Sequence, residues 1–281
     1  MTKLKKQIAT SLRKDLEAGE LILPSLPEVA MTIQDEVKKK SSTALSVAKV
    51  IALDPGLTAH FLKVANSPLY RTQNPVRGLP EAIGLIGIDS TLNMALTYTM
   101  RTMFVNTDGP WKKVLIDQWN EATELGGIVA VLADYLPDFD SDHVMVAAML
   151  QNIGALPLIN HLQHFPELEI EDIESLVEEN ATKAGLALIK LWGLGKTFEN
   201  SVRARHDWSF EESDELDTTD LITIARYHYM KDKKRLQDCP PPSEIPAFRH
   251  LEKLNFTPEM SMQWIDSARE KIRAIKRMLC M

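Results

Sequence analysis

One apolar stretch, residues 145–159 (MVAAMLQNIGALPLI), constrains the fold of this chain more than any other. Its first half repeats apolar side chains at offsets of three and four, which predicts a buried helix. Two side-chain amides, Gln151 and Asn152, lie at the end of the apolar stripe, and Gly154 and Pro157 then interrupt the helical pattern. The stretch therefore predicts a core helix that ends in a pair of polar amides.

The remainder of the chain is also helical in pattern. It contains no alternating β-strand pattern, glycine-rich phosphate loop or internal repeat. Ser25 is predicted to cap one helix, Asp54-Pro55 to begin another, and Asp140 or Ser141 to begin the core helix. Further helices are predicted over residues 3–17, 45–53, 79–87, 89–106, 111–136, 167–179, 182–192, 198–207, 216–230 and 259–279. The expected fold class is all-α, with two packed helical subdomains.

Helix-breaking residues suggest how the chain is divided. The turn pattern at 107–110 is the best boundary between halves, which gives an N-terminal helical subdomain at 21–108 and a C-terminal one at 109–281. Residues 1–20 form a separate amphipathic helix with a basic outer face. That face could touch anionic lipid, but packing on the rest of the protein is the favoured interpretation.

Composition limits the classes of function. The chain has 281 residues, 44% hydrophobic and 25% charged, which is the balance of a soluble globular protein. A net charge of −7 argues against broad nucleic-acid binding, because that partner requires a basic face. Cys239 and Cys280 have no CxxC spacing, so we expect two reduced thiols in a cytoplasmic protein. No secretory signal and no uninterrupted apolar run of membrane-spanning length is present, so no membrane span is predicted.

Several separate words of the sequence resemble a known family. They are Leu-Asp-Pro-Gly-Leu-Thr at 53–58, Lys-Val-Ala-Asn-Ser at 63–67 and Asn-Pro-Val at 74–76. The core helix also keeps the frame Ala148-Met149-Leu150-x-x-Ile153-Gly154. Metal-dependent HD phosphohydrolases have a similar frame with a metal-binding His-Asp pair inside it. The whole pattern, over roughly residues 22–230, resembles the HD-related output domain, HDOD, whose members are shaped like those hydrolases but lack their catalytic residues.

The resemblance implies where the metal ligands of an active hydrolase would lie. In this chain those places, here called the HD positions, are occupied by Glu121, Gln151, Asn152, Ala181, Arg205 (with Ala204 as the alternative), His206 and Arg226. Neutral amides supply neither the imidazole nitrogen nor the anionic oxygen that a transition metal prefers, and arginines repel a cation. The resemblance therefore implies no metal, no cofactor and no catalysis, and the C-terminal half is expected to be a degenerate HD-like bundle.

Two hypotheses address what fills these positions. Glu121 could form an ion pair with Arg205 or Arg226 in place of the metal, because a buried charge without a partner is costly. Alternatively, the arginines could bind an anionic ligand such as a nucleotide phosphate, which guanidinium groups bind bidentately. A third interpretation is that the HD positions are merely packed.

The function implied by the resemblance is a non-catalytic signalling or regulatory module of bacterial cells. Such a module would act by binding a signalling or regulatory protein partner. A nucleotide sensor that uses the HD positions and a residual HD phosphohydrolase are the alternatives.

Overall fold

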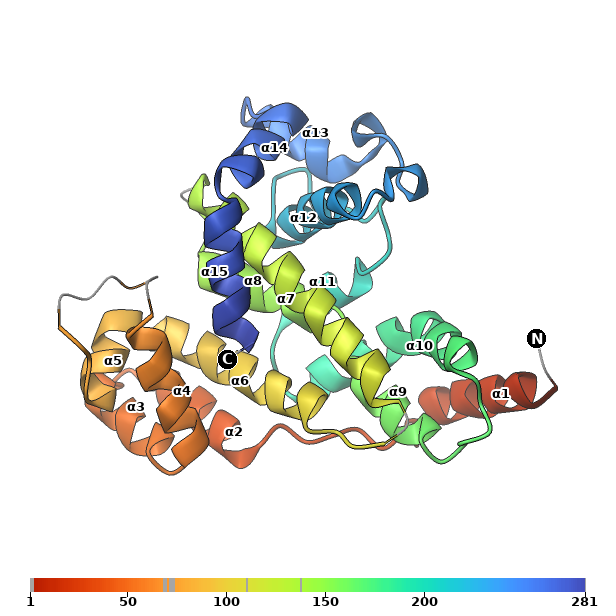
Figure 1. Ribbon diagram of the computed structural model, residues 1–281, viewed down its shortest axis with the longest axis horizontal. Helices are drawn as coiled ribbons and strands as arrows, with labels where there is room; N and C mark the ends of the chain where they lie inside the picture. Colours follow the sequence, from red (N-terminus) through yellow and green to blue (C-terminus); the bar gives the residue numbers. More distant parts are fainter. Residues whose placement is uncertain (1–2, 68–69, 71–73, 110, 137, 281) are drawn as a thin grey trace.

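The computed structural model describes residues 3–67, 70, 74–109, 111–136 and 138–280. Over this part of the chain it contains fifteen α-helices, two short 3-10 helices and no strand (Figure 1). The prediction of an all-α fold is confirmed.

The N-terminal helices gather at one end of the molecule (Figure 1). Their bounds are α1 Lys3–Ala18, α2 Glu28–Val37, α3 Ala44–Ile51, α4 Pro55–Ala65, α5 Leu79–Ile86 and α6 Ile88–Val105. Helix α1 is the exception, because it lies at the opposite end beside α10. The remaining helices are α7 Lys112–Asp134, α8 Ser141–Leu150, α9 Ala155–Leu162, α10 Ile170–Leu191, α11 Lys196–Arg203, α12 Thr218–Asp232, α13 Pro246–Lys253, α14 Pro258–Ser267 and α15 Arg269–Cys280.

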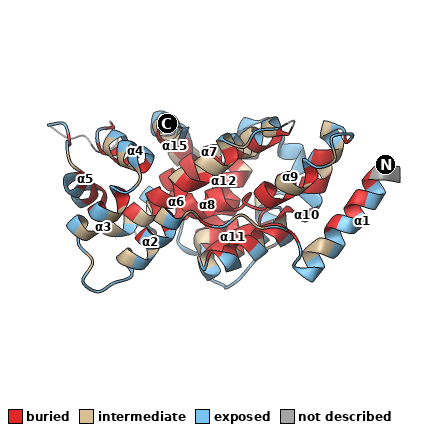
Figure 2. Cartoon of the chain, turned by 90° about the horizontal axis from the view of Figure 1, so that it is seen from below, coloured by how far each residue is buried: buried red, intermediate tan, exposed pale blue. Residues whose placement is uncertain are grey.

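Helix α7 is the axis around which the other helices pack. It packs most extensively against α8 and also contacts α6, α12, α14 and α15, and both α7 and α8 are largely buried (Figure 2). Two glycines in α7 allow close approach: a Cβ on Gly126 would lie 3.2 Å from Met149 Cγ, and one on Gly127 would lie 3.2 Å from the Ile272 carbonyl oxygen. The small residues therefore face α8 on one side and α15 on the other.

The core stretch forms α8, a turn and α9. Asp140 caps α8 by accepting the backbone N–H groups of Asp142 and His143, as predicted. The predicted interruption falls at residues 151–154, and Pro157 lies in the first turn of α9. Residues 141–162 are long and apolar enough to cross a membrane, which the sequence analysis did not expect, but 89% of that stretch's most apolar window is buried inside the protein. It is the centre of the core.

Helix α1 packs on the protein rather than standing apart. Ile8, Ala9 and Leu12 are buried against α10, on the apolar side of the amphipathic pattern. Its basic side chains pair with acidic ones of α10. Lys5 Nζ lies 3.2 Å from Asp172 Oδ1, and Arg13 pairs with Glu179 further along the same two helices. The favoured interpretation of residues 1–20 is confirmed.

Three predictions about helix ends are wrong. Ser25 does not cap α2; Pro27 takes the N-cap position, and the Pro27 carbonyl accepts the N–H groups of Ala30 and Met31. Residues 167–179 and 182–192 form one helix, α10, because the residues between them contain no helix breaker and the Asn180 side chain donates back to the Leu176 carbonyl. Residues 259–279 form two helices, which separate at Ala268.

The turn after α8 approaches α10 more closely than a side chain permits. A Cβ on Gly154 would lie 2.0 Å from the Ala181 carbonyl oxygen and 2.6 Å from the Gly185 nitrogen. Both neighbours are backbone atoms, so they cannot move without shifting a helix. This contact fixes the distance between the core stretch and α10.

We predict that Gly154→Ala lowers the free energy of unfolding by about 3 kcal/mol, because the added methyl group forces the turn away from α10. Denaturant unfolding measures the effect. The matched control is Gly84→Ala in α5, where an added Cβ meets no atom within 4 Å and the gain in helix propensity should stabilise by about 0.5–1 kcal/mol. Equal effects of the two substitutions would contradict the close-approach argument.

Candidate functional site

The HD positions come together where α7, the turn after α8, α10, α11 and α12 meet. Gln151 and Asn152 lie in the turn, Ala181 lies on α10, and Arg205 directly follows the end of α11. Arg226 lies on α12, and α11 and α12 pack together. Residues from separate elements of the chain therefore lie in one region, and their role as a vestigial metal site stays a prediction.

Arg205 is the centre of this region. The residue is only 3% exposed. Its Nε donates to Asn152 Oδ1 at 2.7 Å, and one terminal nitrogen donates to Glu178 Oε2 at 2.8 Å. The guanidinium group therefore joins the turn after α8 to α10 and to the end of α11. A charge-assisted hydrogen bond of this kind is stronger than a neutral one, and the carboxylate partner offsets part of the cost of burying the cation.

Glu178 is the residue that the sequence reasoning missed. Its second carboxylate oxygen, Oε1, lies 3.2 Å from His206 Nε2, so one carboxylate contacts both Arg205 and His206. Glu178 lies one turn before Ala181 on α10, which puts the two residues on the same helix face. The three-residue spacing between Glu178 and Ala181 could have placed Glu178 in this site. The sequence analysis did not use it, because it assigned the two residues to different helices.

Glu121 does not form the predicted ion pair. In the described part of the chain, no ion pair or hydrogen bond includes its carboxylate. Burial raises the pKa of Glu121, and the nearby Glu178 adds to the rise, whereas Arg205 and Arg226 oppose it. The predicted pairing of Glu121 with Arg205 or Arg226 is wrong: Arg205 pairs with Glu178 instead.

Arg226 is used by the backbone. One of its terminal nitrogens donates to the Ala204 carbonyl at 2.7 Å and to the Arg205 carbonyl, and the other donates to the Asp207 carbonyl at 3.3 Å. The guanidinium carbon also lies 4.1 Å from the centre of the Trp208 ring, a cation–π contact. Arg226 therefore satisfies the carbonyl groups left open at the end of α11 and holds the segment that carries Arg205.

These contacts decide which of the sequence hypotheses the site supports. Both guanidinium groups are buried and already donate hydrogen bonds within the protein. Neither has a pair of N–H groups free to bind a phosphate bidentately. Gln151 is 2% exposed, and its Nε2 has no hydrogen-bond partner in the described chain. No group of three or more His, Cys, Asp or Glu residues suited to hold a metal ion occurs among the described residues. The donor set does not fit a hydrolytic metal, which needs several nitrogen and carboxylate ligands around one point.

The sequence matches the HDOD domain over residues 23–208, which is most of the chain. The chain belongs to the HDOD family. The HDOD match begins before α2 and ends just after α11, so it includes Arg205 and Glu178 but not Arg226.

Solved structures share the fold of this HDOD chain. A candidate metal-dependent phosphohydrolase from Shewanella amazonensis is 24% identical, with 99% of this chain and 100% of that chain covered and a TM-score of 0.78. An HDOD domain protein of unknown function from Geobacter sulfurreducens is 19% identical, with 97% and 98% covered and a TM-score of 0.71. A candidate signal transduction protein from Marinobacter aquaeolei is 18% identical, with 96% and 61% covered and a TM-score of 0.63. No curated protein sequence matches.

We predict that Arg205→Met lowers the free energy of unfolding by about 1–3 kcal/mol, because Asn152 Oδ1 loses its donor inside the protein. Glu178 is half exposed, so water replaces part of what it loses. The matched control is Arg203→Met at the end of α11, whose exposed pair with Glu199 should contribute less than about 0.5 kcal/mol. Urea unfolding of both variants tests the difference, and equal losses would mean that Arg205 has no special role.

We also predict that His206 is neutral at pH 7. The half-exposed ring is partly desolvated, which lowers its pKa below the usual value near 6.5, and Arg205 and Arg226 lower it further, whereas Glu178 opposes them. Because the folded state disfavours the protonated ring, this residue's contribution to stability is present above about pH 6.5 and is lost as the pH falls below it. NMR titration of the ring, assigned with His206→Gln, should show a pKa below 6.5 that rises in Arg205→Met. A ring that titrates at or above 6.5 in the wild type would contradict the prediction.

Proposed function

We propose that this HDOD protein is a non-catalytic regulatory module that acts in bacterial signal transduction by binding a protein partner in the cytoplasm. The observation that carries the proposal is the position of the Arg205 guanidinium group. It lies among the HD positions and is bonded to Asn152 and Glu178, the residues of the turn and of α10 that face it. A positive charge fixed there repels a divalent cation. The site would therefore not bind the metal ion that activates water in an HD hydrolase.

The same contact gives the site a structural role. In an HD hydrolase a metal ion joins ligands from several helices. Here a side chain of the protein itself makes connections of that kind, and it is held in place by Arg226 from the other side. A cation that belongs to the chain cannot be removed by a chelator or lost by dilution. The proposed module therefore keeps its shape without a cofactor, as a binding scaffold requires.

The comparisons support a regulatory role without naming a partner. Family membership and the Marinobacter aquaeolei relative, described as a candidate signal transduction protein, both point towards signalling. The candidate phosphohydrolase from Shewanella amazonensis keeps the residual-hydrolase alternative open for testing. Fold similarity alone does not decide between them, because one fold hosts both binding and catalysis.

Metal analysis together with a phosphodiesterase assay tests the non-catalytic half of the proposal. Protein purified with added Mn²⁺ should contain the metal at far below one ion per chain, and it should not release product from cyclic dinucleotides or phosphate esters. Arg205→Met serves as a second sample, since removing the fixed cation alone should not create activity when Gln151 and Asn152 remain amides. Stoichiometric Mn²⁺ with turnover in the wild type would overturn the proposal.

The binding half is tested by affinity capture from bacterial extract followed by reconstitution with the purified partner. We expect saturable association with one protein, with a Kd in the micromolar range or tighter, about −8 kcal/mol or stronger. Dissociation should not change when a chelator is added, because no metal contributes to the scaffold. Failure to reconstitute any captured protein at micromolar concentrations would count against a partner-binding role.

A further inference from the structure

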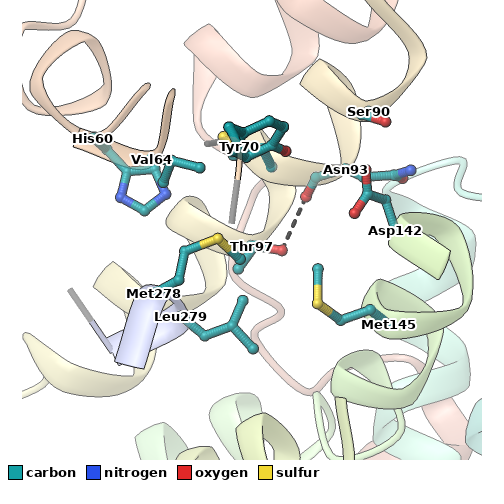
Figure 3. A pocket seen from close by; sticks show the side chains of 11 residues that line it. His60, Val64, Tyr70, Ser90, Asn93, Thr97, Asp142, Met145, Met278 and Leu279 are labelled. Atoms are coloured by element: carbon teal, nitrogen blue, oxygen red, sulfur yellow. Dashed lines mark hydrogen bonds between the residues drawn. The ribbon is translucent and has the colours of Figure 1, made fainter. Parts of the chain in front are cut away.

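A second site lies away from the HD positions, where α4, α6, α8 and α15 meet (Figure 3). It is a partly enclosed cavity between the N-terminal helices and the core. Its volume is only about 20 Å³, which is enough for about one water molecule, so a larger occupant requires its walls to adjust.

Two buried polar side chains line this cavity without a hydrogen-bond partner. His60 on α4 and Asn93 on α6 are each 7% exposed, and no hydrogen bond of either side chain occurs among the described residues. The His60 ring makes only ring contacts, with Phe61 and Tyr98. Burial lowers the pKa of His60 to about 4, so the ring is neutral at pH 7 and offers one donor and one acceptor. Neither side chain is among the fully enclosed polar groups that lack a partner, so their polar atoms are reachable from the cavity and are available to a ligand that enters it.

The opposite wall carries a carboxylate. Asp142 on α8 lines the cavity, and in Figure 3 it lies across the space from His60. Asp142 is in no ion pair of the described chain, and burial raises its pKa. The basic residue that acts on Asp142 is Lys271, which is already paired with Asp134. Asp142 is therefore a carboxylate without a cation of its own.

The charges around the cavity indicate which end of a ligand would lie at Asp142 and which at His60. None of the described residues that line the cavity is a lysine or an arginine, which disfavours phosphates and other anions there. Beyond the lining, Arg101 and Lys63 act on His60 and disfavour a positive charge on that side. A cationic group therefore belongs at Asp142, and a neutral hydrogen-bonding group belongs at His60 and Asn93.

The walls between these two ends can adapt. Three methionines, Met94, Met145 and Met278, come from α6, α8 and α15 and line the cavity. Figure 3 shows Met145 and Met278 beside the space between the polar ends. Methionine is unbranched and flexible, so it can move aside for a short carbon chain and then pack on it. The small volume of the cavity shows that its side chains, these methionines among them, fill most of the space between the helices.

We propose that this cavity binds a short aliphatic amine that carries a hydroxyl group, with its ammonium group at Asp142, its hydroxyl group at His60 and Asn93, and its carbon chain among the methionines. The site goes beyond the proposed regulatory function and does not depend on it. The cavity contains none of the HD positions. An experiment that contradicts ligand binding in the cavity would therefore leave the proposed regulatory function untouched, and the reverse also holds.

Isothermal titration calorimetry of the full chain near pH 7 tests the ligand class. The probes are amino alcohols from ethanolamine to 5-amino-1-pentanol, compared with 1,4-butanediol, which lacks the ammonium group, and n-butylamine, which lacks the hydroxyl group. We expect the best amino alcohol to bind with a Kd below about 1 mM and the diol to bind about tenfold or more weakly. Binding of none of the amino alcohols, or equal binding of the diol, would overturn the proposal.

Variants assign the two ends. Asp142→Asn should remove the preference for amine over diol, whereas Glu259→Gln, an exposed first-turn carboxylate of α14 outside the cavity, should leave binding unchanged. His60→Leu should remove the preference for amino alcohol over butylamine. Binding preferences that survive both cavity substitutions would overturn the assignment.

Asn93→Leu separates a binding role from a structural one. It should abolish binding and raise the thermal unfolding midpoint by about 2–4 °C, because a buried amide without a partner is replaced by an apolar group of similar size. A lower midpoint would show that Asn93 serves the fold instead, and would contradict its place in a ligand site.

Discussion

A buried guanidinium group must find acceptors inside the protein, and this requirement shapes the whole region around Arg205. Asn152 and Glu178 supply those acceptors from two different elements, so the turn after α8, α10 and the end of α11 are held by one side chain. Arg226 then satisfies the carbonyl groups of the segment that carries Arg205. The two arginines therefore act in sequence: Arg226 holds the backbone of the segment, and the Arg205 side chain joins that segment to its neighbours.

The Arg205 contacts also depend on how closely the backbone elements approach. Gly154 lies against Ala181 and Gly185 with no room for a side chain, and a Cβ on Gly185 would lie 2.9 Å from Val202 of α11. Small residues therefore bring the turn, α10 and α11 within reach of one arginine. Larger residues at these places would separate the elements and leave the guanidinium group without one of its partners. Packing and electrostatics act here on the same three segments.

The sequence predicted the elements well where local chemistry decides them. Asp54-Pro55 was recognised as a helix start because proline suits a first turn, and α4 does begin at Pro55. Asp140 was one of two candidate caps for the core helix, and its carboxylate accepts the free N–H groups of the first turn of α8. The HD positions were taken from a family pattern and not from local chemistry. Ser25 failed as a cap because Pro27 begins α2 by backbone geometry alone.

Contacts between segments far apart in the sequence could not be predicted from local sequence patterns. The choice of Glu178 over Glu121 as the partner of Arg205 depends on how α10 is rotated and on its being one helix. The cavity beside His60 depends on four helices, and no local pattern reports how they leave a space. The division into subdomains at 21–108 and 109–281 stays a prediction. Helix α6 of the first packs on both α7 and α8 of the second, so the contacts do not separate the two parts.

The position of α1 has a consequence for how the chain folds. Arg13 of α1 pairs with Glu179 of α10, 166 residues later in the sequence. During synthesis at about 5–20 residues per second, α1 therefore waits on the order of ten seconds before its docking surface exists. Until then its apolar side chains, Ile8 and Leu12 among them, are exposed to the solvent and to chaperones. Docking of α1 belongs to the late steps of folding, because it closes a loop that contains most of the core.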